Sequence, residues 1–229
     1  MRFLVFDTET SGLPKTKIIS PDTLKLWPNI VQFSYVIYDL SLNDIIKTKN
    51  YIIKIPKDIS LEESSKIHGI TNEISETQGI ELIKAFDEFF DDLKEVNNLV
   101  GHNIEFDINM IKVELMRIIN ERLVNQEKVN VCKHYLYYLT NYKNICCTLK
   151  DTVELCNIQL INKQGKPYLK FPKLSELHDK LFNKTPTNLH NSFIDILVTL
   201  RCLIKIKHNF DLNDNCTAFQ SLLKELRFI

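Results

Sequence analysis

Short apolar runs that stop at polar turns occur early in the chain and predict strands. Residues 2–6 (RFLVF) are apolar and end at a polar turn, as a buried strand does. Residues 30–38 are β-branched and aromatic with polar residues in alternation, and residues 48–55 end at Pro56. Both stretches therefore predict strands. Two further short strands are expected at 98–101 and 145–148.

Helical spacing of apolar residues appears between and after these strands. The pattern Ser60-Leu-Glu-Glu63 is a capping box, which predicts a short helix that ends before Gly69. Apolar side chains in 82–93 recur three and four residues apart, as on one face of a helix. Because strands come first and then alternate with helices, we expect an α/β fold with a mixed sheet. The other predicted helices are 106–122, one from 149 onward, 174–181, 190–208 and 218–228.

The chain shows no repeat, low-complexity tract or linker, so residues 1–229 are predicted to form one domain. Residues 123–143 interleave tyrosines with lysines and are interpreted as an insertion. Such a segment can stack on and neutralise a single nucleic-acid strand. The alternative is an inserted helix that packs its Tyr and Leu faces on the core.

Composition excludes several classes of protein. There are 29 Lys+Arg and 29 Asp+Glu, so no global positive charge draws the chain to duplex DNA. The six cysteines have no metal-ligand spacing and are expected to be reduced and buried. No apolar run is long enough for a signal peptide or membrane helix. We expect no membrane association and an intracellular, reducing location, cytoplasmic or nuclear rather than secreted. The oligomeric state is left open.

Acidic residues close the first strand. Because side chains alternate along a strand, Asp7 and Glu9 share one face, with Cα atoms about 6.5–7 Å apart. Adjacent carboxylates repel unless a cation lies between them, which suits Mg²⁺ or Mn²⁺. The sequence contains only five glycines, and Gly12 follows this pair where the chain must turn.

Two later segments add acidic residues. Gly101 ends a predicted strand, and Asp107 follows at the opening of a helix, where the dipole favours an acidic side chain. His190 and Asp195 begin the long helix after an expected cap at Asn188. Residues five apart point about 140° away from each other on a helix, so His190 and Asp195 are not expected to form a simple metal-binding pair and should have different roles.

These segments together resemble the DEDDh (DnaQ-like) 3′→5′ exonuclease family, which includes the proofreading epsilon subunit of bacterial DNA polymerase III, ribonuclease T and oligoribonuclease. Asn191 departs from the pattern, because many relatives carry a small apolar residue after the histidine. The shorter KLSEL (173–177) is also similar to a family segment. The four ordered motifs are FDTETSGL (6–13), IHGIT (67–71), GHNIEFD (101–107) and HNSFID (190–195).

The resemblance implies a ribonuclease H-like fold with a mixed five-stranded sheet flanked by helices. It implies that Asp7, Glu9, Asp107 and Asp195 hold two divalent ions, Mg²⁺ or Mn²⁺, about 3.5–4 Å apart. One ion would prepare a water and the other would stabilise the leaving 3′-oxygen. His190 would be the general base. Substrate contacts would come from Thr10, Leu13, Ile67, His68, His102, Asn103 and Phe106.

The predicted activity is removal of nucleotides from single-stranded or frayed 3′ ends, with DNA favoured over RNA and nucleoside monophosphate as product. Trimming of RNA, as by ribonuclease T or oligoribonuclease, is the nearest alternative. A catalytically silent nucleic-acid-binding module is an alternative of another class. Leu13, Ile67 and Phe106 also admit a purely structural interpretation as core residues.

Overall fold

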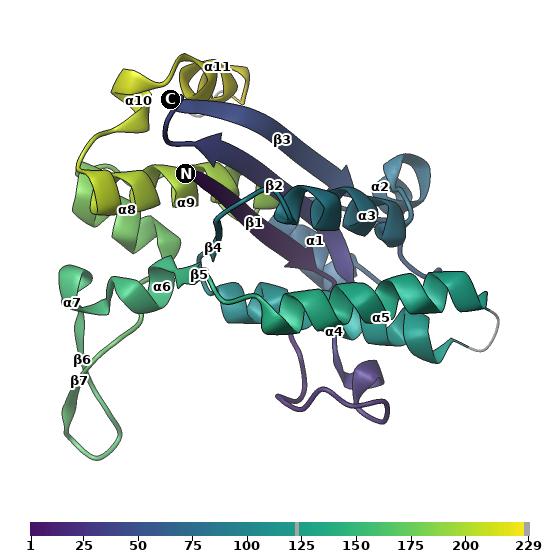
Figure 1. Cartoon of the computed structure of the whole chain (residues 1–229). Coiled ribbons are helices and arrows are strands. Elements are labelled where there is room, and N and C mark those ends of the chain that lie inside the picture. Colours follow the sequence, from purple (N-terminus) through teal and green to yellow (C-terminus); the bar gives the residue numbers. More distant parts are fainter. Residues whose placement is uncertain (122–123, 227–229) are drawn as a thin grey trace.

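A five-stranded sheet forms the centre of the computed structural model, which describes residues 1–121 and 124–226 (Figure 1). The strand order is β3-β2-β1-β4-β5. β1 pairs antiparallel with β2 and parallel with β4, so the sheet is mixed, as predicted. Its strands are β1 (Arg2–Thr10), β2 (Ile30–Asp39), β3 (Asp44–Ile52), β4 (Asn98–Gly101) and β5 (Ile145–Cys147).

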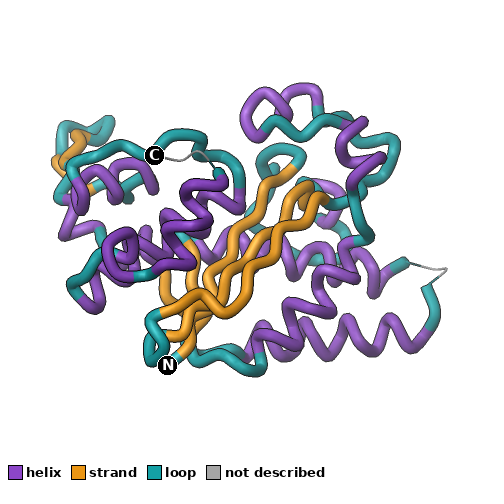
Figure 2. Tube along the Cα trace, turned by 90° about the horizontal axis from the view of Figure 1, so that it is seen from above, coloured by secondary structure: helices purple, strands orange, loops and turns teal. Residues whose placement is uncertain are grey.

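Helices cover both faces of this sheet (Figure 2). The longer ones are α3, α4, α5 and α9, and a 3₁₀ turn, η1 (Leu24–Leu26), precedes β2. The helices are α1 (Glu62–His68), α2 (Asn72–Gln78), α3 (Leu82–Leu93), α4 (Ile104–Asn120), α5 (Gln126–Asn141), α6 (Thr148–Asp151), α7 (Val153–Cys156), α8 (Leu174–Phe182), α9 (Ser192–His208), α10 (Leu212–Asn215) and α11 (Thr217–Glu225).

Alternation along β1 divides the core into two layers. Leu4 and Phe6 face α3, α4 and α5, where aromatic residues of α3 such as Phe89 fill the interior. Phe3 and Val5 face the opposite layer, which α9, α10 and α11 close. Continuing this alternation places Asp7 and Glu9 on the α9 side and Thr8 on the α4 side. The polar side chains at the end of the central strand therefore point alternately into the two layers.

Several predicted boundaries were wrong. β1 runs to Thr10, past the apolar run at 2–6, because pairing with β2 continues through the polar residues that were expected to close the strand. The third strand is Asp44–Ile52 rather than 48–55, because it begins directly after the tight turn from β2. The capping box at Ser60 is not formed. Leu61 is the N-cap of α1, and the Ser60 hydroxyl accepts only from the Glu62 N–H, at 3.3 Å.

Helix boundaries also differ from the prediction. α4 begins at Ile104, two residues early, and the predicted end at 122 lies outside the described residues. The end expected at 228 for the last helix is also outside them; α11 is Thr217–Glu225. The helix expected from 149 is two single turns, α6 and α7. α2 was not predicted, although its N-cap Thr71 accepts from the Ile74 N–H.

The Tyr-rich segment forms a helix that packs on the core, as one of the two interpretations predicted. Cys132 and Leu139 of α5 are buried against the α3 and α4 layer. The ring of Tyr135 stacks on Phe90, with ring centroids 4.1 Å apart and planes nearly parallel. Tyr137, in contrast, is 70% exposed. Most of the aromatic surface of α5 therefore stabilises the fold.

A two-stranded hairpin that the sequence pattern did not predict leaves the body of the protein between α7 and α8 (Figure 1). Its strands are β6 (Gln159–Ile161) and β7 (Pro167–Leu169), which pair antiparallel. They are only three residues long and lack a clear alternation, so they resemble loop in sequence.

Asparagine occupies most left-handed backbone positions outside glycine. Asn157, Asn183 and Asn209 end α7, α8 and α9 with φ between 48° and 57°. α1 ends before Gly69, as predicted, and Gly69 adopts the same backbone region with φ of 77°. Short polar side chains tolerate this region better than other L-residues.

All six cysteines are buried and unpaired, as the composition predicted. Among the described residues, no helix combines the length and apolar character needed to span a bilayer.

Candidate active site

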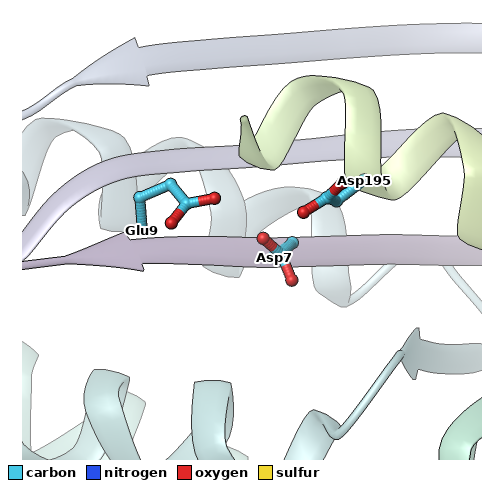
Figure 3. Close-up of side chains that lie close together, drawn as sticks. All are labelled: Asp7, Glu9 and Asp195. Atoms are coloured by element: carbon cyan, nitrogen blue, oxygen red, sulfur yellow. The ribbon is translucent and has the colours of Figure 1, made fainter. Parts of the chain in front are cut away.

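Three carboxylates meet where β1 passes the start of α9. One ligand oxygen each from Asp7, Glu9 and Asp195 can be chosen so that all three lie within 4.8 Å of one another. Figure 3 shows Asp7 and Glu9 rising from β1 toward Asp195 on the first turn of α9. The sequence spacing paired Asp7 with Glu9, and the fold brings in Asp195 from 186 residues further along the chain.

Asp107 lies beside this group but is turned toward β1. Its Oδ1 accepts hydrogen bonds from the Thr8 backbone N–H, at 3.2 Å, and from the Thr8 hydroxyl, at 2.7 Å. Asp107 is in the first turn of α4, where the helix dipole favours its charge. It is outside the three-residue group. Three of the four predicted carboxylates therefore form a tight group, and Thr8 orients the fourth.

Burial and mutual repulsion raise the pKa of these carboxyl groups. Burial is the larger cause for Glu9, whose pKa rises to about 8, with the charges of Asp195 and Asp107 adding to it. Burial also raises the pKa of Asp195 and of Asp107 to about 7. The pKa of Asp7 is raised by burial and then by the three neighbouring carboxylates. Like charges held this close are relieved at neutral pH either by protonation or by a compensating cation.

The donor set fits a hard divalent cation. All candidate ligands are carboxylate oxygens, which Mg²⁺ and Mn²⁺ prefer over Zn²⁺-type nitrogen and sulfur sets. Asp195 Oδ1 is buried and has no hydrogen-bond partner within the described part of the chain. An unpartnered buried carboxylate oxygen is costly unless a proton or an ion satisfies it. Asp7, Glu9 and Asp195 therefore form a possible metal site.

His190 lies outside the helix that was expected to contain it. α9 begins at Ser192, and its N-cap is Asn191 rather than Asn188. His190 is exposed and has a left-handed φ of 71°. Its backbone N–H donates to Asp195 Oδ2 at 3.2 Å. The bond joins the two residues through the backbone and leaves the imidazole in solvent at the edge of the acidic group.

A buried polar network that the sequence did not reveal holds the start of α9. Gln32 of β2 is 1% exposed, and its Nε2 donates to Asn191 Oδ1 at 3.3 Å. Its Oε1 accepts from the Ser192 N–H at 3.2 Å. Ser34, two residues along β2, bonds the Ser192 hydroxyl at 2.7 Å. The alternation of Gln32 and Ser34 in a buried strand was the available signal.

The hydrogen bonds of the Asn191 side chain give a structural reason for an asparagine at this position, where many relatives carry a small apolar residue. Its Oδ1 accepts from the Phe193 N–H at 3.1 Å and so caps α9, while also accepting from Gln32. A small apolar residue at this position would make neither bond. The side chain thus fixes the helix start between His190 and Asp195.

The first two predicted substrate-contact segments, at residues 10–13 and 67–68, combine exposed and buried side chains. Leu13 is 83% exposed and Ile67 is 63% exposed, so neither belongs to the core. The Thr10 hydroxyl donates to the Gly12 carbonyl at 2.7 Å and fixes this turn. His68 is buried, and burial lowers its pKa, partly opposed by the nearby Thr10 backbone. Its Nδ1 accepts from the Ile70 N–H at 3.1 Å.

The third segment combines a surface residue with structural ones. Asn103 is exposed in a left-handed conformation before α4. Phe106 is half-buried and packs on the α3 and α4 layer. Burial lowers the pKa of His102 to about 4, so its ring is neutral. Its Nε2 then donates to the Pro172 carbonyl and its Nδ1 accepts from the Thr148 hydroxyl, both at 3.0 Å.

The mixed five-stranded sheet, with helices on both faces and an acidic group at the end of its central strand, has the ribonuclease H-like fold. Among proteins with this fold, the chain belongs to the RNase_T family of exonucleases, whose sequence model matches residues 4–203. The match confirms the resemblance to DnaQ-like exonucleases. No curated protein sequence matches the chain significantly.

Solved structures of exonucleases share this fold. Exonuclease I from Methylocaldum szegediense has a TM-score of 0.59 and 19% identity, covering 93% of this chain and 42% of that one. E. coli Exonuclease I, solved with a dT13 oligonucleotide, has a TM-score of 0.58 and 19% identity, covering 99% and 43%. A 3′-exonuclease solved in a study of 3′-end specific recognition of histone mRNA stem-loop has a TM-score of 0.57 and 12% identity. The match covers 91% of this chain and 82% of that one. The chain thus spans about two fifths of the length of the Exonuclease I chains.

Proposed function

We propose that the protein is a metal-dependent 3′→5′ exonuclease that releases nucleoside monophosphates from single-stranded or frayed 3′ ends, with DNA preferred over RNA. The observation that carries the proposal is the convergence of Asp7, Glu9 and Asp195 within 4.8 Å in a chain of the exonuclease family. Four neighbouring carboxylates, Asp107 included, match the charge of two divalent cations, Mg²⁺ or Mn²⁺.

The carboxylates would hold these ions, which supply charge stabilisation at the phosphate and a more acidic water. Asp7, Glu9 and Asp195 would be direct ligands. Asp107, held by Thr8, would contribute on the α4 side of β1. The raised pKa values of the carboxyls would fall once cations bind, because the bound charge favours the ionised form.

His190 would take a proton from the attacking water. Its exposure and its position beside Asp195 leave the imidazole free to approach a bound phosphodiester. An imidazole is a common general base in enzymes that work at neutral pH. Asn191 and Gln32 would act as positioning residues, because they fix the backbone that carries His190.

The predicted substrate-contact residues would receive the terminal nucleotide at the acidic group. Leu13 would wedge against the last base and Thr10 would hold the nucleotide, with Ile67 and His68 along its sugar and base. Asn103 and Phe106 would shape the pocket. His102 would contribute indirectly, because both of its ring nitrogens are engaged by protein groups. Stacking of this kind tolerates any base, which suits trimming without sequence preference.

The preference for DNA is supported by the fold shared with Exonuclease I, solved with a deoxyoligonucleotide. RNA is the alternative substrate, since another fold relative was solved in a study of histone mRNA 3′-end recognition. The 2′-hydroxyl would decide between them.

The test uses two 5′-labelled 20-mers of one sequence, DNA and RNA, with Mg²⁺ or Mn²⁺. We expect a ladder that shortens from the 3′ end, faster for DNA, and absent with EDTA or in Asp7→Ala. A faster RNA ladder would replace DNA with RNA as the substrate. Absence of cleavage on both strands, with metal binding intact, would overturn the enzyme proposal in favour of a binding module.

A further inference from the structure

The β6–β7 hairpin is an ordered arm that stands away from the sheet and its helices (Figure 1). Asn162 organises its turn, because Asn162 Oδ1 accepts from the backbone N–H groups of Gln164 and Lys166, both at 2.9 Å. Gly165 supplies the left-handed residue that the turn requires, with φ of 77°. The tip is therefore a defined structure that presents Lys163 and Lys166.

All the charged residues in segment 157–173, which contains this arm, are basic, although the protein as a whole is neutral. The segment carries four lysines and no acidic residue. Since the whole chain has a net charge of zero, the other residues together carry a net charge of −4. Lys170 pairs with Glu176. Among the described residues, the other three lysines, Lys163, Lys166 and Lys173, form no ion pair.

Apolar and aromatic side chains accompany these lysines on the surface. Tyr168 and Leu160 are directly opposite each other in the hairpin register, and they are 47% and 42% exposed. Ile161 is 75% exposed and Phe171 is 58% exposed. A two-stranded hairpin with so little burial gains stability from a surface that covers it.

The base of the arm is fixed at the end of the sheet where the central strand β1 carries the carboxylates. His102, which follows β4, donates through Nε2 to the Pro172 carbonyl. β4 is parallel to β1, so the end of β4 is at the same edge as Asp7 and Glu9. A strand whose 3′ end occupies the acidic group can thus continue past His102 toward the arm.

We propose that the β6–β7 arm binds the single strand upstream of the 3′ terminus, with Lys163 and Lys166 on phosphates and Tyr168 stacked on a base. Lysines interleaved with exposed aromatic residues suit a single strand, because each base offers a face and each phosphate a charge. The base of the arm lies beside the end of the sheet that carries the acidic group, which favours this occupant over a second copy of the chain. The inference rests on the proposed exonuclease function, which it deepens by assigning a path to the substrate.

Binding of labelled dT20 and U20 in EDTA, measured by fluorescence anisotropy, tests the arm without cleavage. The variant Lys163→Gln/Lys166→Gln is expected to lower the slope of log K against log salt by about 1.4, since each single-strand phosphate contact contributes about 0.7. Tyr168→Ala is expected to weaken binding about 5- to 150-fold. The matched control is Lys207→Gln/Lys224→Gln, two exposed lysines on α9 and α11 that form no ion pair among the described residues; the end of α9 lies beside Phe3, at the start of β1.

Hydrolysis of thymidine 5′-monophosphate p-nitrophenyl ester separates the arm from the acidic site, because a single nucleotide does not reach the hairpin. We expect the arm variants to hydrolyse it like wild type while degrading 20-mers more slowly. If wild type hydrolyses no substrate, the proposed function fails, whatever the anisotropy shows. If the arm variants bind 20-mers like the control variant, the arm proposal is overturned. Loss of a dimer in sedimentation, with nucleic-acid binding unchanged, would equally overturn it and assign the arm to a second copy.

Discussion

The hydroxyl of Thr8 donates to the carboxylate of Asp107 at 2.7 Å, which joins the central strand to the first turn of α4. Both Thr8 bonds favour ionised Asp107 and so counteract the rise in its pKa that burial causes. Thr8 stands between Asp7 and Glu9 but points to the other face of the sheet. A residue between two candidate ligands thus controls the protonation of a third carboxylate.

Replacing Thr8 by valine should shift the pH profile of activity. Thr8→Val keeps the shape and removes the hydroxyl donor, so the pKa of Asp107 rises further above its ordinary value. In a plot of kcat/KM against pH, the acid limb should move to higher pH by about one unit. This shift corresponds to roughly 1.4 kcal/mol of lost stabilisation of the ionised carboxylate. Thr8→Ser retains the hydroxyl and should leave the limb in place. An unchanged limb in Thr8→Val would show that this bond does not govern the ionisation.

Stability of the metal-free protein should fall as pH rises. The carboxyls of Glu9, Asp107 and Asp195 have folded pKa values of about 7 to 8, well above those of free carboxyls. The folded state therefore binds more protons than the unfolded state between about pH 4 and 8. The stabilisation that these protonated carboxyls contribute is complete below about pH 4. It declines as pH rises and is gone once pH has passed through their folded pKa values of about 7 to 8.

Scanning calorimetry in EDTA from pH 5 to 8.5 measures this decline in Tm. Addition of Mg²⁺ should raise Tm most at the high end, where the carboxylates are ionised and bind the ion best. The double variant Glu9→Gln/Asp195→Asn should show a flatter profile and a smaller Mg²⁺ effect. A wild-type Tm that rises with pH in EDTA would contradict the pKa shifts.

His190 should matter for rate and hardly at all for folding. His190→Gln removes an exposed imidazole whose backbone N–H still bonds Asp195. We expect a loss of about 10²- to 10⁴-fold in kcat, as for removal of a general base. Tm and Mg²⁺ affinity should stay unchanged. His134→Gln, an exposed histidine on α5, is the matched control and should retain full activity. Full activity in His190→Gln would remove the histidine from the mechanism.

Asn191 should couple helix capping to catalysis. Asn191→Ala removes the cap of α9 and the bond from Gln32, which should cost about 1–2 kcal/mol of unfolding free energy. kcat should fall with little change in KM, because the backbone of His190 loses its support. Asn125→Ala removes the cap of α5, where Asn125 Oδ1 accepts from the Lys128 N–H at 2.8 Å. That control should lose stability alone; an equal loss of kcat in both variants would reduce Asn191 to a general stabilising role.

The sequence predicted the central features of the site because they depend on local pattern. Asp7 and Glu9 share a face through strand alternation alone, and Asp107 follows β4 in the first helical turn. Asp195 needed the motif resemblance, because no spacing rule connects it with β1. The bounds of the third strand failed, because β3 begins directly after the turn from β2 and its pairing with β2 is not encoded in the apolar run itself.

Contacts between distant segments were beyond sequence reasoning for a physical reason. The bond between Gln32 and Asn191 joins residues 159 apart, and either residue alone suits a surface. The helix start at Ser192 follows from that network, whereas Asn188 is an equally acceptable cap by residue type. The role of His190 is a prediction that the variant above tests, and the substrate contacts also remain predictions.

Asparagine takes the left-handed turns that glycine fills in many chains. In the part of the chain that the structure describes, six of the seven non-glycine residues with positive φ are asparagine. Asparagine has a Cβ atom and explores fewer backbone conformations than glycine when the chain is unfolded. Each of these turns therefore removes less conformational entropy on folding than a glycine would. With only five glycines, the protein ends its helices sharply while limiting the freedom of its unfolded chain.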